Sequence, residues 1–272
     1  MTESPEINWR LDVAYDGEPF YGFQSQPDGN TVQDHLEKAL TTILRKTTKI
    51  LGGSRTDSGV HAENQVCMFS ARPNIDALKA IRALNALLPK EIRVYKISND
   101  VADFHPHGSS CGKIYRYLLW KGFCLDPFAS RFVWEVKPDI DVGKLKRCLV
   151  EFEGTHDFIS MSNTGSSVKT SVRNIVEISV AEKGPLLEIW VHGEGFLKQM
   201  VRNIVGTAVG IALGKIDESP SEILAQKSRK AGGETAPAQG LSLVRSIFKG
   251  DSVSIASEQE KASLGFCHSH IF

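Results

Sequence analysis

Apolar and polar residues follow strand and helix periods through the first half of the chain. The alternating run Ile7–Tyr15 ends at the turn-forming pair Asp16 and Gly17, and it predicts a strand. Thr31, with Asp34 three residues further on, forms a capping-box sequence before apolar residues at helical spacing. The same patterns predict strands over 49–53, 64–71, 91–97 and 113–120, and a helix over 76–88.

The second half repeats this mixture of strands and helices. The longest predicted helix is 196–213, in which one face is apolar and therefore packs on a sheet. Ser219 and Glu222 flank Pro220 as a second capping box. The remaining predicted elements are a helix over 141–153, strands over 171–181 and 186–192 that turn at 183–185, and a closing strand over 241–248.

The order of these elements predicts an α+β fold. Two halves of the order β-α-β-β-α-β build antiparallel sheets that carry helices on one face. We expect an N-terminal lobe over 1–108, a C-terminal lobe over 109–248 and a flexible tail over 249–272.

Composition describes a soluble globular chain without a membrane-spanning segment. Of the 272 residues, 41% are hydrophobic and 24% are charged, which is ample for a large core. Lys and Arg together number 32, and so do Asp and Glu. Because the net charge is zero, a nucleic-acid partner would have to bind a local basic cleft rather than a generally basic surface.

The cysteines favour a reducing compartment. Their number is five, they are scattered, and no two form a C-x-x-C pair. This pattern is typical of free thiols in a cytoplasmic protein, and the first residues show no secretory signal.

The segment Gly52–Ala62, with the sequence GGSRTDSGVHA, is the strongest candidate for a functional loop. It follows a predicted strand and places Arg55 and Asp57 among small and turn-forming residues. An arginine–aspartate pair that stiffens a turn is the simpler interpretation. No second acid lies close in sequence, so a single-carboxylate mechanism fits better than a two-carboxylate hydrolase.

Two residues of the predicted C-terminal lobe complete the candidate site. Tyr115 and Tyr117 share one face of a predicted strand and Arg116 faces the other way, so Tyr115 is either a half-buried strand residue or a ring for stacking on a base. Arg202 lies at the border of the polar side of the last long helix, where it either extends into water or reaches a carboxylate. An arginine beside Asp57 would keep that acid ionised, as a carboxylate nucleophile requires.

We predict no cofactor and no metal. The stretch from Gly193 to Lys198 opens like a dinucleotide fingerprint, but Lys198 occupies the place of its third glycine. The His105/His107 and His268/His270 pairs lack the further ligands of a metal site.

Seven blocks of the sequence resemble, in order, those of the TruA family of tRNA pseudouridine synthases. They are YDGEPFYGFQSQ, TVQDHLEKAL, GSRTDSGVHAENQV, DFHPHGSSCGKIYRY, SVRNIVEI, GEGFLKQMVRNIVG and TAPAQGLSL. The resemblance implies a cytoplasmic, homodimeric isomerase that needs no cofactor and converts uridine to pseudouridine at positions 38, 39 and 40 of the tRNA anticodon stem-loop. It also implies two ferredoxin-like lobes that meet in one sheet, with the active site in the cleft between them.

The resemblance assigns roles to four residues. Asp57 is similar to the family's nucleophilic aspartate, and Arg55 to the arginine that helps to extract the base. Tyr115 is similar to the tyrosine that stacks on uracil, and Arg202 to the arginine paired with the catalytic carboxylate. The sequence leaves open whether Asp57 attacks the sugar C1′, attacks C6 of the base or removes a sugar proton.

Some positions depart from the family blocks. Phe23 and Ser25 stand in a block that reads GWQRQ in the family, and His107 replaces an arginine, so the RNA contacts and the modified positions are open. Ser58 in place of alanine adds one hydroxyl. A non-catalytic RNA-binding or RNA-chaperone module is the alternative function, and a single-carboxylate sugar hydrolase is a third.

Overall fold

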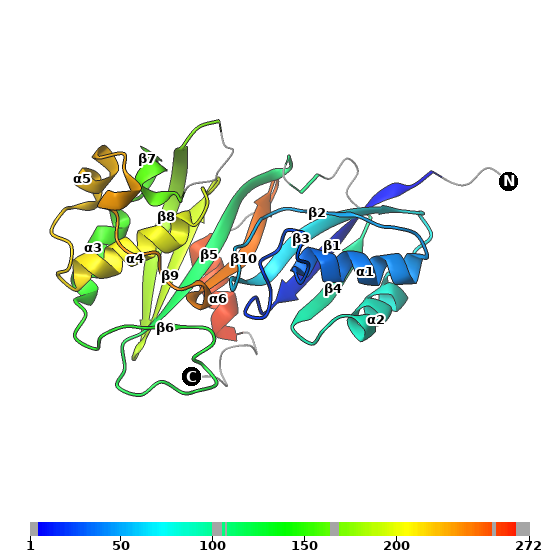
Figure 1. Cartoon of the computed structure of the whole chain (residues 1–272), viewed down its shortest axis with the longest axis horizontal. Coiled ribbons are helices and arrows are strands. Elements are labelled where there is room, and N and C mark those ends of the chain that lie inside the picture. Colours follow the sequence, from blue (N-terminus) through cyan, green and yellow to red (C-terminus); the bar gives the residue numbers. More distant parts are fainter. Residues whose placement is uncertain (1–4, 100–104, 107, 164–168, 252–253, 265–272) are drawn as a thin grey trace. The chain divides into compact units, whose positions relative to one another are not determined.

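A computed structural model describes residues 5–99, 105–106, 108–163, 169–251 and 254–264 of the chain (Figure 1). It divides into two compact units. Unit 1 comprises Met1–Cys111 and Ser242–Lys249, and unit 2 comprises Gly112–Leu241 and Gly250–Phe272. Each unit mixes helices with mostly antiparallel strand pairs. The division into lobes over 1–108 and 109–248 stays a prediction, and residues 242–249 are grouped here with unit 1.

Unit 1 is built on strand β3. One edge of β3 pairs with β1, and its other edge pairs with β2 near one end and with β10 near the other. Strand β4 continues the sheet beyond β1. The β10–β3 pairing is parallel and the others are antiparallel. The elements are β1 (Ile7–Tyr15), α1 (Val32–Leu44), β2 (Ile50–Gly52), β3 (His61–Ala71), α2 (Ala77–Leu87), β4 (Ile92–Ser98) and β10 (Leu241–Phe248).

The core of unit 1 follows from the predicted periodicities. Leu11 and Val13 of β1 are fully buried, as are Leu36 and Leu40 of α1, which lie one helical turn apart. Removing a leucine side chain of this size from water stabilises the fold by about 1.5–3 kcal/mol. Helices α1 and α2 pack against each other. The candidate loop 52–62 therefore belongs to a unit with a buried apolar core.

Unit 2 has a four-stranded antiparallel sheet in the order β5-β9-β8-β7, with the short β6 parallel to β5. Helices α3 and α4 pack against each other. The elements are β5 (Ser110–Trp120), β6 (Trp134–Glu135), α3 (Val142–Val150), β7 (Gly154–Asp157), the 3₁₀ turn η1 (Phe158–Met161), β8 (Val172–Lys183), β9 (Leu186–Gly193), α4 (Met200–Ala212), α5 (Pro220–Ala225), η2 (Arg229–Ala231), η3 (Ala238–Gly240) and α6 (Ile255–Leu264).

Local sequence signals locate several boundaries correctly. Strands β1 and β10 have the predicted bounds. The Thr31 side chain accepts from the Asp34 amide, and the Asp34 carboxylate accepts in return from the Thr31 amide, as the capping box predicts. Ser219 and Glu222 form the second predicted box at the start of α5.

The prediction for the last long helix is wrong in two respects. Helix α4 begins at Met200 rather than at residue 196, because Gln199 adopts a left-handed conformation with φ of 59° that a continuing helix cannot contain. Every residue of α4 other than Arg202 is buried, so the helix has no polar side. It has 13 residues and shares with α1 the greatest length among the described helices.

The flexible tail predicted over 249–272 contains a helix. In α6 the Ile255 side chain is fully buried and Gln259 donates to the Ser179 hydroxyl at 3.0 Å. The prediction of a loose segment is therefore wrong for these residues, and 265–272 lie outside the described residues. Among the described helices, none has the length and apolar character needed to cross a bilayer.

Candidate active site

In the loop between β2 and β3, Arg55 and Asp57 alternate with two buried residues. Ser54 and Thr56 are buried, with 1% and 7% of their surface exposed, whereas Arg55 is exposed and Asp57 is partly exposed. Burial of Ser54 and Thr56 therefore leaves Arg55 and Asp57 as the residues of this stretch that reach the surface.

Side chains of the neighbouring strands hold this loop from beneath. The Tyr15 hydroxyl lies 2.8 Å from the Thr56 hydroxyl, and the Gln65 amide donates to the Ser54 carbonyl at 2.6 Å. The backbone of Gly53 also donates to the Val66 carbonyl at 2.8 Å. These bonds fix the residues before and after Arg55, and so limit the positions that the loop can take.

The segment that follows β1, residues 17–23, also packs against the loop. The Phe23 amide donates to the Thr56 carbonyl at 3.1 Å, and the Ser58 hydroxyl donates to the Phe20 carbonyl at 3.1 Å. At Gly17 the backbones approach so closely that a Cβ atom would lie 2.0 Å from the Val60 carbonyl oxygen. Only glycine fits at such an approach.

Phe23 supports the loop rather than facing solvent. Its side chain is 2% exposed, its ring stacks on Tyr15 with centroids 6.3 Å apart, and a Cβ atom at Gly52 would lie 2.2 Å from it. In the unbound protein this departure from the family block is therefore a packing position. Ser25 is exposed, and the other departure, His107, lies outside the described residues.

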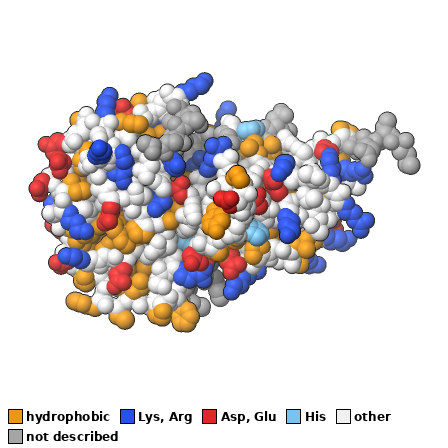
Figure 2. All heavy atoms as spheres, viewed as in Figure 1, with side chains coloured by type: hydrophobic (Ala, Val, Ile, Leu, Met, Phe, Trp, Pro, Cys, Tyr) orange, Lys and Arg blue, Asp and Glu red, His pale blue; other side chains and the backbone are white. Residues whose placement is uncertain are grey.

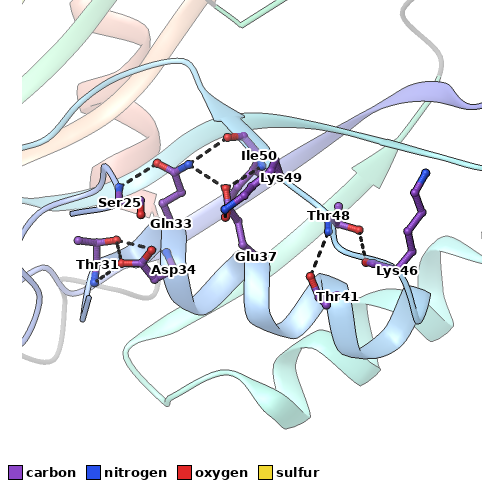
Figure 3. Close-up of polar contacts among 10 residues, drawn as sticks. All are labelled: Ser25, Thr31, Gln33, Asp34, Glu37, Thr41, Lys46, Thr48, Lys49 and Ile50. Carbon is purple, nitrogen blue, oxygen red and sulfur yellow. Dashed lines mark hydrogen bonds and ion pairs between the residues drawn. The ribbon is translucent and has the colours of Figure 1, made fainter. Parts of the chain in front are cut away.

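Helix α1 holds the strand that leads into the loop (Figure 3). Glu37 accepts from the Ile50 amide at 3.1 Å, and Gln33 donates to the Ile50 carbonyl at 3.2 Å and to Glu37 at 2.8 Å. Gln33 also accepts from the Ser25 amide at 3.0 Å. Lys49 donates to Glu37 at 2.7 Å, and this bond raises the pKa of the lysine. The two helix side chains thus bond to both backbone groups of Ile50.

His61 closes the far end of the loop. Its side chain is 4% exposed, and its Nδ1 lies 3.0 Å from the Gly17 amide and 3.1 Å from an Asp16 carboxylate oxygen. An amide N–H can only donate, so the Gly17 bond requires an unprotonated Nδ1, whereas an ion pair with Asp16 would require a protonated one. The bond to Nδ1 thus satisfies a buried backbone amide and ties this end of the loop to the turn after β1.

In unit 2, Tyr115 and Tyr117 differ in their surroundings. Tyr117 is fully buried, donates its hydroxyl to the Pro237 carbonyl at 2.7 Å, and has its pKa raised by burial. Tyr115 is 8% exposed, and its ring meets Phe196 edge to face at 5.1 Å. Between them, Arg116 is buried and stacks its guanidinium over Trp190 at 5.2 Å. Tyr117 is thus a structural residue, and the ring of Tyr115 is held by its edge-to-face contact with Phe196.

Arg202 is the partly exposed residue of the otherwise buried helix α4. Its Nε donates to the Ala236 carbonyl at 2.7 Å, and the Ala236 amide donates back to the Arg202 carbonyl at 3.2 Å. The side chain is therefore held by a specific contact and is not simply extended into water.

The four predicted site residues divide between the two units. Arg55 and Asp57 share the loop of unit 1, and Tyr115 and Arg202 belong to unit 2. The pairing of Arg202 with Asp57 stays a prediction. In the described residues, no three His, Cys, Asp or Glu side chains gather as metal ligands would. His268 and His270 lie outside these residues.

Comparison with known proteins defines the class of the protein. A family profile described as tRNA pseudouridine synthase matches residues 13–107 and 148–249. The match identifies the chain as a pseudouridine synthase, an enzyme of the isomerase class. The matched segments contain Arg55, Asp57 and Arg202, whereas Tyr115 lies between them.

Curated relatives narrow the assignment. The tRNA pseudouridine synthase A of Aquifex aeolicus is 40% identical over 89% of this chain and 99% of its own length. That of Bacillus licheniformis is 41% identical over the same shares. The chain belongs to the tRNA pseudouridine synthase A, or TruA, family. A chain of a solved Cbf5–Nop10–Gar1 complex aligns at a TM-score of 0.38 and 19% identity over 88% of this chain and 59% of its own, which adds nothing to that assignment.

Proposed function

We propose that the protein converts uridine to pseudouridine at one or more of positions 38, 39 and 40 of the tRNA anticodon stem-loop, with Asp57 as the catalytic carboxylate. Membership of the family supports the reaction. The alternating burial of residues 54–57 supports the choice of Asp57 as the catalytic residue. Arg55 and Asp57 reach the surface, while hydrogen bonds from several neighbouring segments hold the loop around them. Such preorganisation is what a catalytic group needs.

The reaction is an isomerisation in which every atom of the nucleoside is kept. The bond between C1′ and N1 breaks, the uracil turns, and a bond forms between C1′ and C5. The proton on C5 leaves and N1 gains a proton, so no oxidant or reductant is consumed. Asp57 would act by attack on C1′, by attack on C6 or by removal of a sugar proton.

Three further residues have proposed roles. A uridine in a stem must be flipped out of its stack, which costs about a few kcal/mol. Arg55 is exposed beside Asp57 and can take the place of the flipped base. Tyr115 would stack on uracil. Arg202 would pair with Asp57 and keep it ionised, since an adjacent opposite charge lowers an aspartate pKa by roughly 1 to 3 units.

The wider architecture is part of the proposal. The element order β1-α1-β2-β3-α2-β4 supports a ferredoxin-like arrangement in unit 1. Basic and acidic side chains lie interspersed over the face in Figure 2, in keeping with the equal numbers of the two. We therefore propose that tRNA binds a local basic cleft rather than a generally basic surface. A homodimer in the cytoplasm completes the proposal.

Replacing Asp57 by asparagine tests the catalytic assignment. Release of tritium from tRNA labelled at uridine C5 reports formation of the new C1′–C5 bond. We expect the rate to fall at least about 10⁴-fold, as for loss of a nucleophile elsewhere. Asp28→Asn, at an exposed carboxylate of the same unit, is the matched control and should retain activity.

Binding and cellular assays separate the alternatives. The Asp57→Asn protein should still bind tRNA and keep its circular dichroism spectrum. Persistent tritium release by Asp57→Asn would show that Asp57 is not the catalytic carboxylate. Full rescue of a deletion strain by this variant would favour a non-catalytic RNA-binding module. Mapping pseudouridine in tRNA from cells that lack the protein identifies which of the three positions it modifies.

A further inference from the structure

A buried asparagine next to Arg202 on α4 is the centre of a polar network. Asn203 is fully buried, and its amide nitrogen donates to the Met161 carbonyl at 2.9 Å and to the Asn163 side chain at 3.1 Å. Its amide oxygen accepts from Arg229 at 2.8 Å and from the Thr235 hydroxyl at 2.7 Å. Two donors and two acceptor positions are the full capacity of an amide group, so every one is used.

Arg229 joins the same partners from the other side. Its Nε donates to the Asn163 side chain at 2.9 Å, and its Nη2 donates to the Thr235 hydroxyl at 3.0 Å. Partial burial lowers the pKa of Arg229. Arg229 is partly exposed, yet three of its bonds end on side chains of this network, so the guanidinium is held in place.

The network ends one residue from the contact that holds Arg202. Thr235 precedes Ala236, whose carbonyl accepts from the Arg202 Nε at 2.7 Å. The approach of this segment to α4 is as close as two backbones allow, because a Cβ atom at Gly206 would lie 1.9 Å from the Glu234 carbonyl oxygen. The position of the Ala236 carbonyl is therefore set by contacts with the helix that carries Arg202.

The same segment is tied to the strand that carries Tyr115. The Pro237 carbonyl accepts from the Tyr117 hydroxyl at 2.7 Å, and a Cβ atom at Gly240 would lie 2.5 Å from the Tyr117 ring. Residues 229–237, here called the 229–237 segment, thus link helix α4 to strand β5. Both elements carry a residue of the proposed site.

We propose that the 229–237 segment positions Arg202 for the isomerisation. Asn203 and Arg229 hold Thr235, Thr235 fixes the Ala236 carbonyl, and that carbonyl sets the plane of the Arg202 guanidinium. Asn203, Arg229 and Thr235 are positioning residues, since they act through Arg202. The inference rests on the proposed role of Arg202.

Substitution of Thr235 gives a matched pair of variants. Thr235→Val keeps the shape of the side chain and removes the hydroxyl, whereas Thr235→Ser keeps the hydroxyl. We expect Thr235→Val to lower kcat for tRNA about tenfold, since small misplacements of a catalytic group are costly. The KM of Thr235→Val and both constants of Thr235→Ser should stay within about twofold of the parent protein. Arg229→Met removes donors to the same network and should reproduce the loss in kcat.

A second readout follows Arg202 itself. The nitrogen–proton signal of its Nε, identified by its absence in Arg202→Lys, should exchange with water more than about tenfold faster in Thr235→Val than in Thr235→Ser, because the Ala236 bond is loosened. In the Arg202→Lys background, Thr235→Val should have no further effect on kcat.

The outcomes keep the two proposals distinct. If neither Thr235→Val nor Arg229→Met slows the reaction, or if valine and serine slow it equally, the positioning role is refuted. An unchanged Arg202 Nε signal in Thr235→Val would refute it as well. If the parent protein forms no pseudouridine in tRNA, the proposed function fails, while the exchange measurement still tests whether Thr235 holds Arg202.

Discussion

Loss of the Tyr15 hydroxyl should loosen the Asp57 loop through its neighbour Thr56. The two hydroxyls lie 2.8 Å apart, and the two residues are only 5% and 7% exposed. Tyr15→Phe and Thr56→Val each remove one hydroxyl and keep the shape of the side chain. Each single variant removes this contact and keeps the other hydroxyl in a buried position.

The expected magnitudes follow from this burial. A buried polar group that loses its partner costs about 1–3 kcal/mol, so each single variant should be less stable by roughly that amount. Replacing both partners by apolar groups of the same shape is nearly neutral. The double variant should therefore be no less stable than the worse single variant, which gives a coupling of about 1 kcal/mol or more.

Two measurements test this cycle. Urea denaturation gives the change in unfolding free energy, provided that the slope with denaturant is unchanged. Hydrogen exchange of the Phe23 amide, which donates to the Thr56 carbonyl, reports on the loop alone. If the two single effects add to within about 0.3–0.5 kcal/mol, the hydroxyls do not interact and the reasoning is refuted.

Two further predictions concern packing and reactivity. Gly17→Ala would place a Cβ atom 2.0 Å from the Val60 carbonyl oxygen, so we expect the unfolding free energy measured by urea denaturation to fall by more than about 2 kcal/mol. Gly108→Ala is the control, because the atom nearest to its Cβ would lie 3.5 Å away. An equal fall in that variant would contradict the steric argument. Burial raises the pKa of the Cys148 thiol to about 12, whereas Cys111 is exposed. Iodoacetamide at neutral pH should therefore label Cys111 at least about tenfold faster in the folded protein, as peptide mass spectrometry can show, and equal rates would refute the burial.

The parts of the fold that local chemistry determines could be predicted from the sequence. Thr31 with Asp34 marks the start of α1 because the two residues bond to each other's backbone. The start of α4 was missed because Gln199 takes a left-handed conformation that no local signal demands. Burial of α4 on all sides was missed as well, since its surroundings come from segments distant in sequence.

The candidate site shows the same division. Asp57 and Arg55 stand out by residue type and by their place after a strand. Their support by Gln65 and Tyr15 depends on strand pairing and could not be predicted from spacing alone. Asn203 carries a weak signal in the sequence, since it is a polar residue among the apolar positions of α4.

The bonds that α1 makes to Ile50 also bear on solubility. A backbone row left unpaired at the side of a sheet is a template for another chain, and natural proteins block such rows. Here the amide and carbonyl of Ile50 are occupied by Glu37 and Gln33, so a second copy cannot add a strand at that point. The helix that holds the strand before the Asp57 loop therefore also blocks one place where folded copies could pair edge to edge.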